Sequence, residues 1–316
     1  MKETTLKLKR NFKIITLIII VILLFTASSL ISPFFLDINN ILNLLVQVSV
    51  LAILAIGMTY VIISTGLDLS VGSNIAFSGL IGVLVFKSTE NPLLGMLFCI
   101  IAGAFIGLLN GLMIGYLKIN AFMVTLSTLA IARGATLLIT GGRTISVTNN
   151  IFNFLGQGTL FNIPVILILI PILYVAFYFV LKRTIFGRSI YALGGNEKAA
   201  IVAGIKSKLI ILYIYMLSGA LAGLCAIFIV GRLSSLQPWA GLGTEFETVI
   251  AVVLGGINLA GGEGELHESF VGVIILAIIL NILSLLPISP FYQYIAKGLI
   301  MIAAVFIYGR LQKYSI

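Results

Sequence analysis

Few side chains in this sequence have the types and spacing that enzyme or metal chemistry requires. The single histidine, His267, lies beside Glu265 and Glu268, with no second imidazole and no thiolate cluster to complete a metal site. The two cysteines, Cys99 and Cys225, fall in apolar runs, where a thiol behaves as a small hydrophobic group. The patterns G-x-x-x-x-G-K-[ST] and G-x-S-x-G do not occur. The sequence therefore predicts no catalytic residue, no metal ligand and no cofactor bound by this chain.

Polar side chains inside apolar stretches are the informative ones, because a polar group in lipid must find a partner within the protein. Arg133 and Lys297 lie within such stretches, and Asp68 lies at the end of one. These residues either line a polar path or gate, or pair structurally with neighbouring helices. The candidates are Asp68, Ser70, Asn74, Asn110, Asn120, Thr125, Arg133 and Asn258.

The elements that must position these residues are membrane-spanning helices. Hydrophobic residues make up 60% of the 316 residues and charged residues only 9%, unlike a soluble domain. A helical crossing needs about 20 apolar residues. The sequence therefore predicts an all-α integral membrane protein, a single domain over residues 1–316 with about ten transmembrane helices. The expected runs are 14–31, 40–63, 70–86, 92–117, 121–140, 164–181, 209–230, 246–260, 268–286 and 291–309.

Basic residues are distributed unevenly between the two sides of these helices. If the N-terminus is inside, cytoplasmic segments hold 14 Lys and Arg residues and outer segments hold three. This asymmetry predicts cytoplasmic N- and C-termini in a multi-pass protein of the cell membrane. The basic N-terminal segment before residue 14 resembles the start of a secretory signal, but the run that follows is long enough to span and precedes many others. We therefore expect a retained first helix.

Two polar loops stand out, an outer one at 141–162 and a basic cytoplasmic one at 182–208. Within the second, Asn196 followed by Glu197 predicts a capped short helix that protrudes as a contact element. An internal repeat is also visible, since T-G-L-D-L-S-V-G at 65–72 matches G-G-I-N-L-A-G-G at 255–262. Such glycine-interrupted copies are typical of broken helices in transporters, although glycines also simply allow close helix packing.

Four segments together resemble one known family, the ribose-type monosaccharide permeases of bacterial ATP-binding cassette (ABC) importers. The similarity covers most of the chain. The segments are G-L-D-L-S-V-G-S at 66–73, A-F-M-V-T-L-S-T at 121–128, F-G-R-S-I-Y-A-L-G-G-N-E-K-A-A-I-V-A-G-I at 186–205 and V-L-G-G-I-N-L-A-G-G-E-G at 253–264.

The resemblance implies a permease in the bacterial cytoplasmic (inner) membrane, in a homodimer or a heterodimer with a paralogue. Two ATPase domains, which use ATP and Mg²⁺, would lie below it, and an extracytoplasmic sugar-binding protein above it. No nucleic acid partner is expected. The loop at 182–208 would couple to the ATPase, or else its lysines would only anchor helices at the membrane surface. The expected coupling residues are Gly194, Gly195, Asn196, Glu197, Ala199, Ala200 and Gly204.

Alternative cargoes remain open at this point: nucleosides, a signalling furanone or amino acids. A transporter that works without an ATPase is a further alternative. It would want intramembrane carboxylates for ion coupling, and Asp68 is the one candidate that the sequence indicates.

Overall fold

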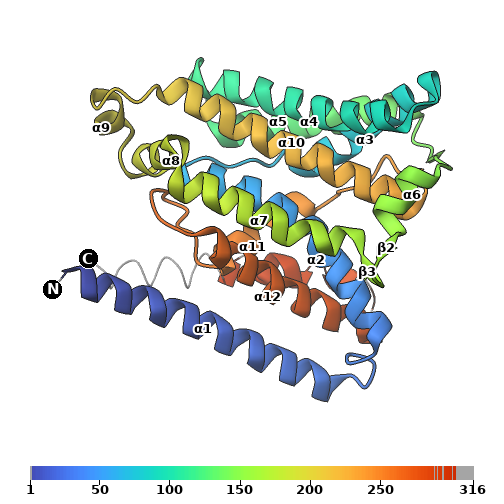
Figure 1. Ribbon diagram of the computed structural model, residues 1–316, viewed down its shortest axis with the longest axis horizontal. Helices are drawn as coiled ribbons and strands as arrows, with labels where there is room; N and C mark the ends of the chain where they lie inside the picture. Colours follow the sequence, from blue (N-terminus) through green and yellow to red (C-terminus); the bar gives the residue numbers. More distant parts are fainter. Residues whose placement is uncertain (1, 288, 290, 294, 301, 304–316) are drawn as a thin grey trace.

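The computed structural model shows helices lying side by side along the long axis of the molecule (Figure 1). It describes residues 2–287, 289, 291–293, 295–300 and 302–303. The long helices are α1 (Lys2–Ile31), α2 (Ile38–Ile63), α3 (Val71–Thr89), α4 (Pro92–Gly115), α5 (Ala121–Thr140), α7 (Val165–Arg183), α10 (Ser207–Leu233) and α12 (Leu266–Leu285). The short elements are β1 (Ile145–Ser146), α6 (Asn150–Gln157), β2 (Thr159–Leu160), β3 (Ile163–Pro164), α8 (Ile185–Gly195), α9 (Glu197–Val202), β4 (Ser235–Leu236) and α11 (Thr244–Leu254).

Eight helices in the described part of the chain are long and apolar enough to cross a membrane. They correspond to eight of the ten predicted runs, so the all-α membrane fold is confirmed. The predicted span at 246–260 is wrong, because α11 has 11 residues and is about 16 Å long, half of a bilayer core of about 30 Å. The last predicted run, 291–309, lies partly outside the described residues, which end at residue 303.

Side-chain caps explain where several helices begin. Asp37, Asn91, Asn120, Asn149 and Asn196 each accept a hydrogen bond from a backbone N–H in the first turn of the following helix. These bonds satisfy amide groups that have no partner within the helix. The capped helix predicted at Asn196 is thereby confirmed as α9.

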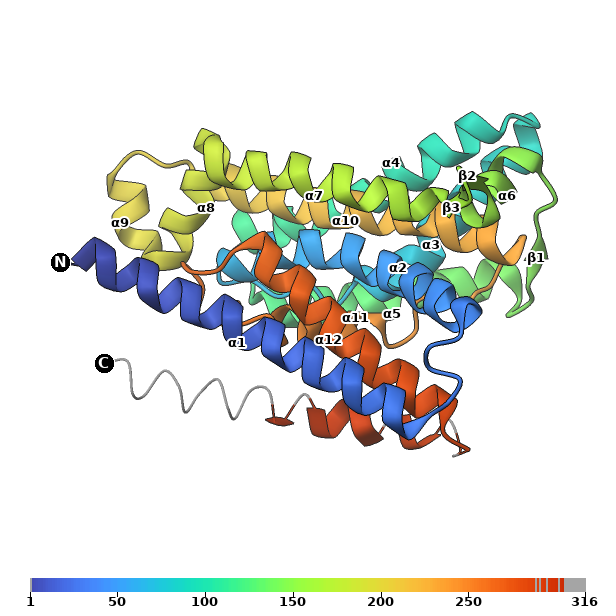
Figure 2. The ribbon, with the colours of Figure 1, turned by 60° about the horizontal axis from the view of Figure 1, so that its bottom comes forward.

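The two ends of the helix bundle differ in structure. The start of α1 lies at the same end as α8 and α9, whereas α6 with β2 and β3 lies at the opposite end (Figures 1 and 2). This arrangement agrees with the predicted placement of the N-terminus and the 182–208 loop on one side of the membrane. The C-terminus lies outside the described residues.

Helices α4 and α10 pack through glycines. A Cβ atom at Gly103 would collide with the backbone of Gly219, and a Cβ at Gly219 would collide with the backbone of Gly103. Gly107 and Gly223 meet the opposing helix backbone in the same way. Small residues allow this close approach, which replaces side-chain packing with direct backbone contact.

The predicted repeat corresponds to two similar helix ends. Helix α2 and helix α11 are each followed by a residue with positive φ, Thr65 at 66° and Gly256 at 89°. Each end then forms a turn in which an Asx side chain accepts a backbone N–H two residues later, at 3.0 Å for Asp68 and 2.7 Å for Asn258. The two copies meet, since the N–H of Gly262 donates to the carbonyl of Ile63 at 2.8 Å.

Candidate functional site

A chain of buried hydrogen bonds connects four segments around Asp68. The hydroxyl of Thr128 on α5 donates to the Asn110 side chain on α4 at 2.6 Å, and Asn110 donates to Ser70 at 2.9 Å. Ser70 donates to Asp68 at 2.6 Å, and Ser218 on α10 donates to the other carboxylate oxygen at 2.8 Å. All five side chains are buried. Of the candidates predicted from the sequence, Asp68, Ser70 and Asn110 are thus brought together, whereas Thr128 and Ser218 were missed.

The network lies inside the bundle at about half its height. Ser218 is roughly midway along α10, and Asn74 near the start of α3 donates to the carbonyl of Gly103, midway along α4, at 3.2 Å. Thr125 donates to the carbonyl of Leu67 at 3.3 Å. Residues 64–70 therefore return from the end of α2 into the bundle, and the surrounding helices bond to them.

Two further candidates lie apart from this network. Asn120 is exposed and caps α5, where its side chain accepts the N–H of Phe122 at 2.9 Å. Asn258 forms its turn in the loop between α11 and α12. Each of the two side chains accepts a hydrogen bond from a backbone N–H two residues later, and the structure does not bring either residue to Asp68.

Arg133 fixes a second non-helical segment, residues 234–243 between α10 and α11. Its guanidinium group donates to the carbonyls of Pro238 at 2.8 Å and Ala240 at 2.9 Å. The side chain is 8% exposed, and its Nε has no hydrogen-bond partner among the described residues. A buried guanidinium is held where several acceptors satisfy its fixed donors.

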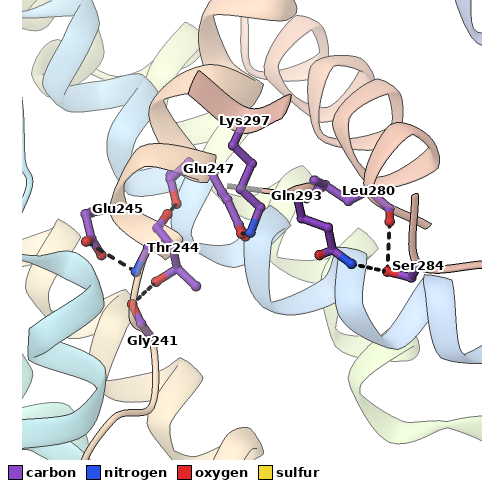
Figure 3. A network of polar contacts seen from close by, with 10 residues as sticks. Gly241, Thr244, Glu245, Glu247, Leu280, Ser284, Gln293 and Lys297 are labelled. Carbon is purple, nitrogen blue, oxygen red and sulfur yellow. Dashed lines mark hydrogen bonds and ion pairs between the residues drawn. The ribbon is translucent and has the colours of Figure 1, made fainter. Parts of the chain in front are cut away.

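Two carboxylates at the start of α11 were not among the residues predicted from the sequence. Glu245 is 4% exposed, and its Oε2 has no hydrogen-bond partner among the described residues. Glu247 forms an ion pair with Lys297, shown in Figure 3. The expectation that Asp68 is the one intramembrane carboxylate candidate is therefore wrong. The predicted apolar run began at 246, so Glu247 stood inside it and could have been recognised.

The starts of α3 and α11 meet in the middle of the bundle. A Cβ atom at Gly72 would collide with the Glu245 carboxylate and with the backbone of Gly241. Figure 3 shows Gly241 and Thr244 beside Glu245, with the Thr244 hydroxyl donating to the Gly241 carbonyl at 2.7 Å. The Glu245 carboxylate thus lies against the N-terminal turn of α3, where the helix dipole favours negative charge.

The predicted coupling segment is a pair of helices, α8 and α9, at one end of the bundle (Figure 1). Glu197 bonds to Lys118 at 2.6 Å. Tyr191 on α8 donates to the carbonyl of Gly264 at 2.7 Å, and burial raises its pKa, so the hydroxyl stays a neutral donor. The segment is therefore attached to both the α4–α5 turn and the loop before α12.

The two alanines of α9 face in different directions. Ala199 is exposed, but Ala200 is 4% exposed because it packs inward, so the expectation that both form a contact face is wrong for Ala200. The apolar surface of α9 is instead completed by Ile201 and by Val202, which is 89% exposed. Gly194 packs against the backbone of Ile63 and Gly262, whereas Gly195 and Gly204 have open space around them. Of the predicted contact residues, those at the exposed surface are Gly195, Asn196, Glu197, Ala199 and Gly204.

A pocket of about 190 Å³ opens beside this segment. Lys118 and Glu197 lie at it, together with Thr65 and Tyr215. The Tyr215 hydroxyl donates to the Leu67 carbonyl at 3.2 Å, next to Asp68. The pocket therefore lies between α9 and residues 64–66, which precede the segment that carries Asp68.

Several known proteins are similar to this chain over most of its length. The family described as "Branched-chain amino acid transport system / permease component" matches residues 40–305. The ribose import permease protein of Haemophilus influenzae is 39% identical over 91% of this chain and 90% of its own length. That of Bacillus subtilis is 41% identical over 88% and 87%. The L-arabinose ABC transporter permease protein of Azospirillum brasilense is 32% identical over 92% and 85%. No solved structure matches the chain.

Proposed function

Because the chain belongs to the permease-component family that matches residues 40–305, we propose that it is the membrane subunit of an ABC importer that carries a monosaccharide inward across the cytoplasmic membrane. The observation that carries this proposal is the similarity to two ribose import permeases, at 39% and 41% identity over about nine-tenths of each chain. The arabinose relative supports the same substrate class, a small neutral sugar.

The proposed mechanism is alternating access driven by a separate ATPase that uses ATP and Mg²⁺. The exposed surface of α8 and α9 is the proposed contact for that ATPase, since Ala199 and Val202 offer small apolar side chains that fit a groove. A sugar-binding protein would contact the opposite end of the bundle, near α6. A second permease copy or a paralogue would complete the path.

The buried network around Asp68 is proposed to act as a gate rather than as a sugar-binding surface. Its side chains already bond to one another, and Asp68 and Asn110 are almost fully buried, so sugar contact would require these bonds to open. The bonds join residues 64–70, α4, α5 and α10, so a displacement of one of these segments changes the hydrogen bonds of the others.

One second cargo class has specific support, because the description of the matching family names branched-chain amino acids. Nucleosides and a furanone are further cargoes for the same architecture. Two carboxylates at α11, Glu245 and Glu247, would suit an ion-coupled transporter without an ATPase, but the similarity to an ABC transporter permease favours ATP coupling.

Reconstitution into liposomes tests the proposal. The chain is combined with its ATPase and binding protein, and uptake of radiolabelled ribose, L-arabinose and leucine is measured with and without ATP. We expect ATP-dependent uptake of a sugar. Uptake of leucine but of neither sugar would show that the cargo is an amino acid. Equal sugar uptake with and without ATP would overturn the ABC mechanism.

A further inference from the structure

The only tryptophan of the chain, Trp239, lies on the non-helical segment 234–243 and is 54% exposed. Non-helical backbone that faces lipid is not expected in a membrane protein, because lipid offers no hydrogen bonds to its N–H and C=O groups. An exposed aromatic ring on such a segment therefore needs a surrounding other than lipid. The position of this segment in the bilayer therefore decides what the ring faces.

The segment descends from one end of the bundle to its middle. Near its start, β4 pairs with β1, at the end opposite α8 and α9 (Figure 2). At its other end α11 begins, and the loop after α11 reaches Gly194 and Ile63 at the α8 end. Since α11 is only about 16 Å long, its first residue lies about halfway through the bilayer core.

Non-helical backbone at this depth is tolerated where it is buried in protein or lines a water-filled cavity, and not where it faces lipid. Buried polar atoms nearby agree with this, since Arg133 Nε and Glu245 Oε2 have no hydrogen-bond partner among the described residues. Such atoms normally bond to water or protein. The exposed side of the segment therefore faces an aqueous path or another chain.

Arg133 fixes the direction of the ring. Its two hydrogen bonds go to the carbonyls of Pro238 and Ala240, the residues on either side of Trp239. The N–H of Leu242 also donates to the Trp239 carbonyl at 3.2 Å. Three hydrogen bonds thus hold the backbone at and beside Trp239, while its side chain stays exposed.

We propose that Trp239 is a substrate-contact residue, whose indole face packs against the C–H face of the monosaccharide as it passes, and that Arg133 is the positioning residue. This inference rests on the proposed sugar transport. A sugar has an apolar face and a hydroxyl rim, and aromatic side chains with a few polar groups are what bind such ligands. The exposed amide of Gln237 is the adjacent partner for the hydroxyl rim.

Thiol labelling tests what the ring faces. Both native cysteines are fully buried, so a cysteine placed at Trp239 is the reactive thiol. Phe105→Cys is the matched control, because Phe105 is also 54% exposed but lies on the spanning helix α4. A charged methanethiosulfonate, which reacts in water, is applied to the assembled importer. We expect Trp239→Cys to be modified at least about tenfold faster than Phe105→Cys, because lipid excludes the charged reagent.

Equal slow labelling of both positions would overturn the proposal, because the ring would then face lipid. High-yield disulfide formation between two copies of Trp239→Cys, with labelling that ribose does not slow, would also overturn it in favour of a contact between permease copies. Slower labelling of Trp239→Cys in the presence of transported ribose or L-arabinose supports the proposal.

Uptake variants test the aromatic contact. Trp239→Phe keeps an aromatic face and is expected to transport within about twofold of the wild type, whereas Trp239→Leu keeps only apolar bulk and is expected to lose about tenfold in rate. Wild-type rates in Trp239→Leu would remove the contact but leave the proposed function intact. Failure of the wild type to transport any sugar would instead remove the proposed function.

The role of Arg133 has a separate spectroscopic readout, because Trp239 is the only tryptophan of the chain. In the purified permease, Arg133→Gln should shift the emission maximum of Trp239 and lower sugar uptake about as much as Trp239→Leu. Arg143→Gln changes an exposed arginine and is the control. An unchanged emission spectrum with normal uptake in Arg133→Gln would remove the positioning role.

Discussion

The carboxylate of Asp68 accepts a 2.8 Å hydrogen bond from the hydroxyl of Ser218, a residue 150 positions further along the chain. The same carboxylate holds Ser70 through its hydroxyl and its backbone N–H. One buried side chain thus joins the re-entrant segment 64–70 to α10.

The first prediction concerns the charge of Asp68. Asp68→Asn keeps the size and an acceptor oxygen, so we expect a folded, assembled permease whose sugar uptake falls about fivefold or more because the charge-assisted bonds are lost. Asp37→Asn is the control, since Asn caps a helix as well as Asp does. ATP-dependent uptake in vesicles measures both variants, and full uptake by Asp68→Asn would leave Asp68 with a purely structural role.

The second prediction concerns the contact between α4 and α10. Gly219→Ala adds a methyl group where the Gly103 backbone lies, so we expect a loss of about 1–3 kcal/mol in stability and a lower unfolding temperature in detergent. Gly134→Ala is the control on α5, where a Cβ meets no neighbour, and we expect up to about 1 kcal/mol of stabilisation from helix propensity. Equal unfolding temperatures of the two variants would contradict the tight contact.

The third prediction separates docking from anchoring at α9. Ala199→Trp places a large side chain on the exposed surface, so we expect a permease of normal stability that no longer co-purifies with its ATPase. Ala200→Trp would instead lower stability, because Ala200 is buried. Ser88→Trp, at an exposed position on α3, is the control. If Ala199→Trp supports normal sugar-stimulated ATP hydrolysis, the lysines of the loop only anchor helices.

The fourth prediction concerns orientation and follows from the uneven distribution of basic residues. Lys198→Cys should react with an impermeant thiol reagent only from the cytoplasmic side, and Asn150→Cys only from outside. Both positions are exposed, and the native cysteines are buried. Labelling of intact cells compared with inverted vesicles measures this, and the reverse pattern would invert the topology.

The fifth prediction concerns the ion pair between Lys297 and Glu247 in Figure 3. Lys297→Met leaves a partly buried carboxylate without its charge partner, so we expect a loss of about 3 kcal/mol in stability. Adding Glu247→Gln removes that charge and should recover part of the loss. Unfolding temperatures of the wild type, the two single variants and the double variant measure the coupling, and additive losses would show that the pair contributes nothing.

The sequence predicts the spanning helices well, because each of eight described spans is a long apolar run. It fails at α11 for a physical reason. Residues 249–253 are apolar because they are buried in protein, and the glycines after Leu254 continue the apolar composition although they form a turn. Apolar composition alone does not distinguish a half-length helix that is buried in protein from a span.

The site is only partly predictable. Asp68 and Arg133 stand out because charges are rare in apolar runs. Ser218 and Thr128 do not, since hydroxyl residues are common in membrane helices and their partners lie on other helices. The inward orientation of Ala200 depends on how α9 packs, which no local pattern shows.

The glycine contact between α4 and α10 also limits how the molecule can move. Where Gly103 and Gly219 touch backbone to backbone, there are no side chains that can change rotamer to accommodate sliding or rotation of one helix on the other. Helices α4 and α10 are therefore expected to move together as one rigid unit. Residues 64–70 and 234–243 are not helical and lie outside this rigid unit, so we expect opening and closing to change these segments rather than the contact between α4 and α10.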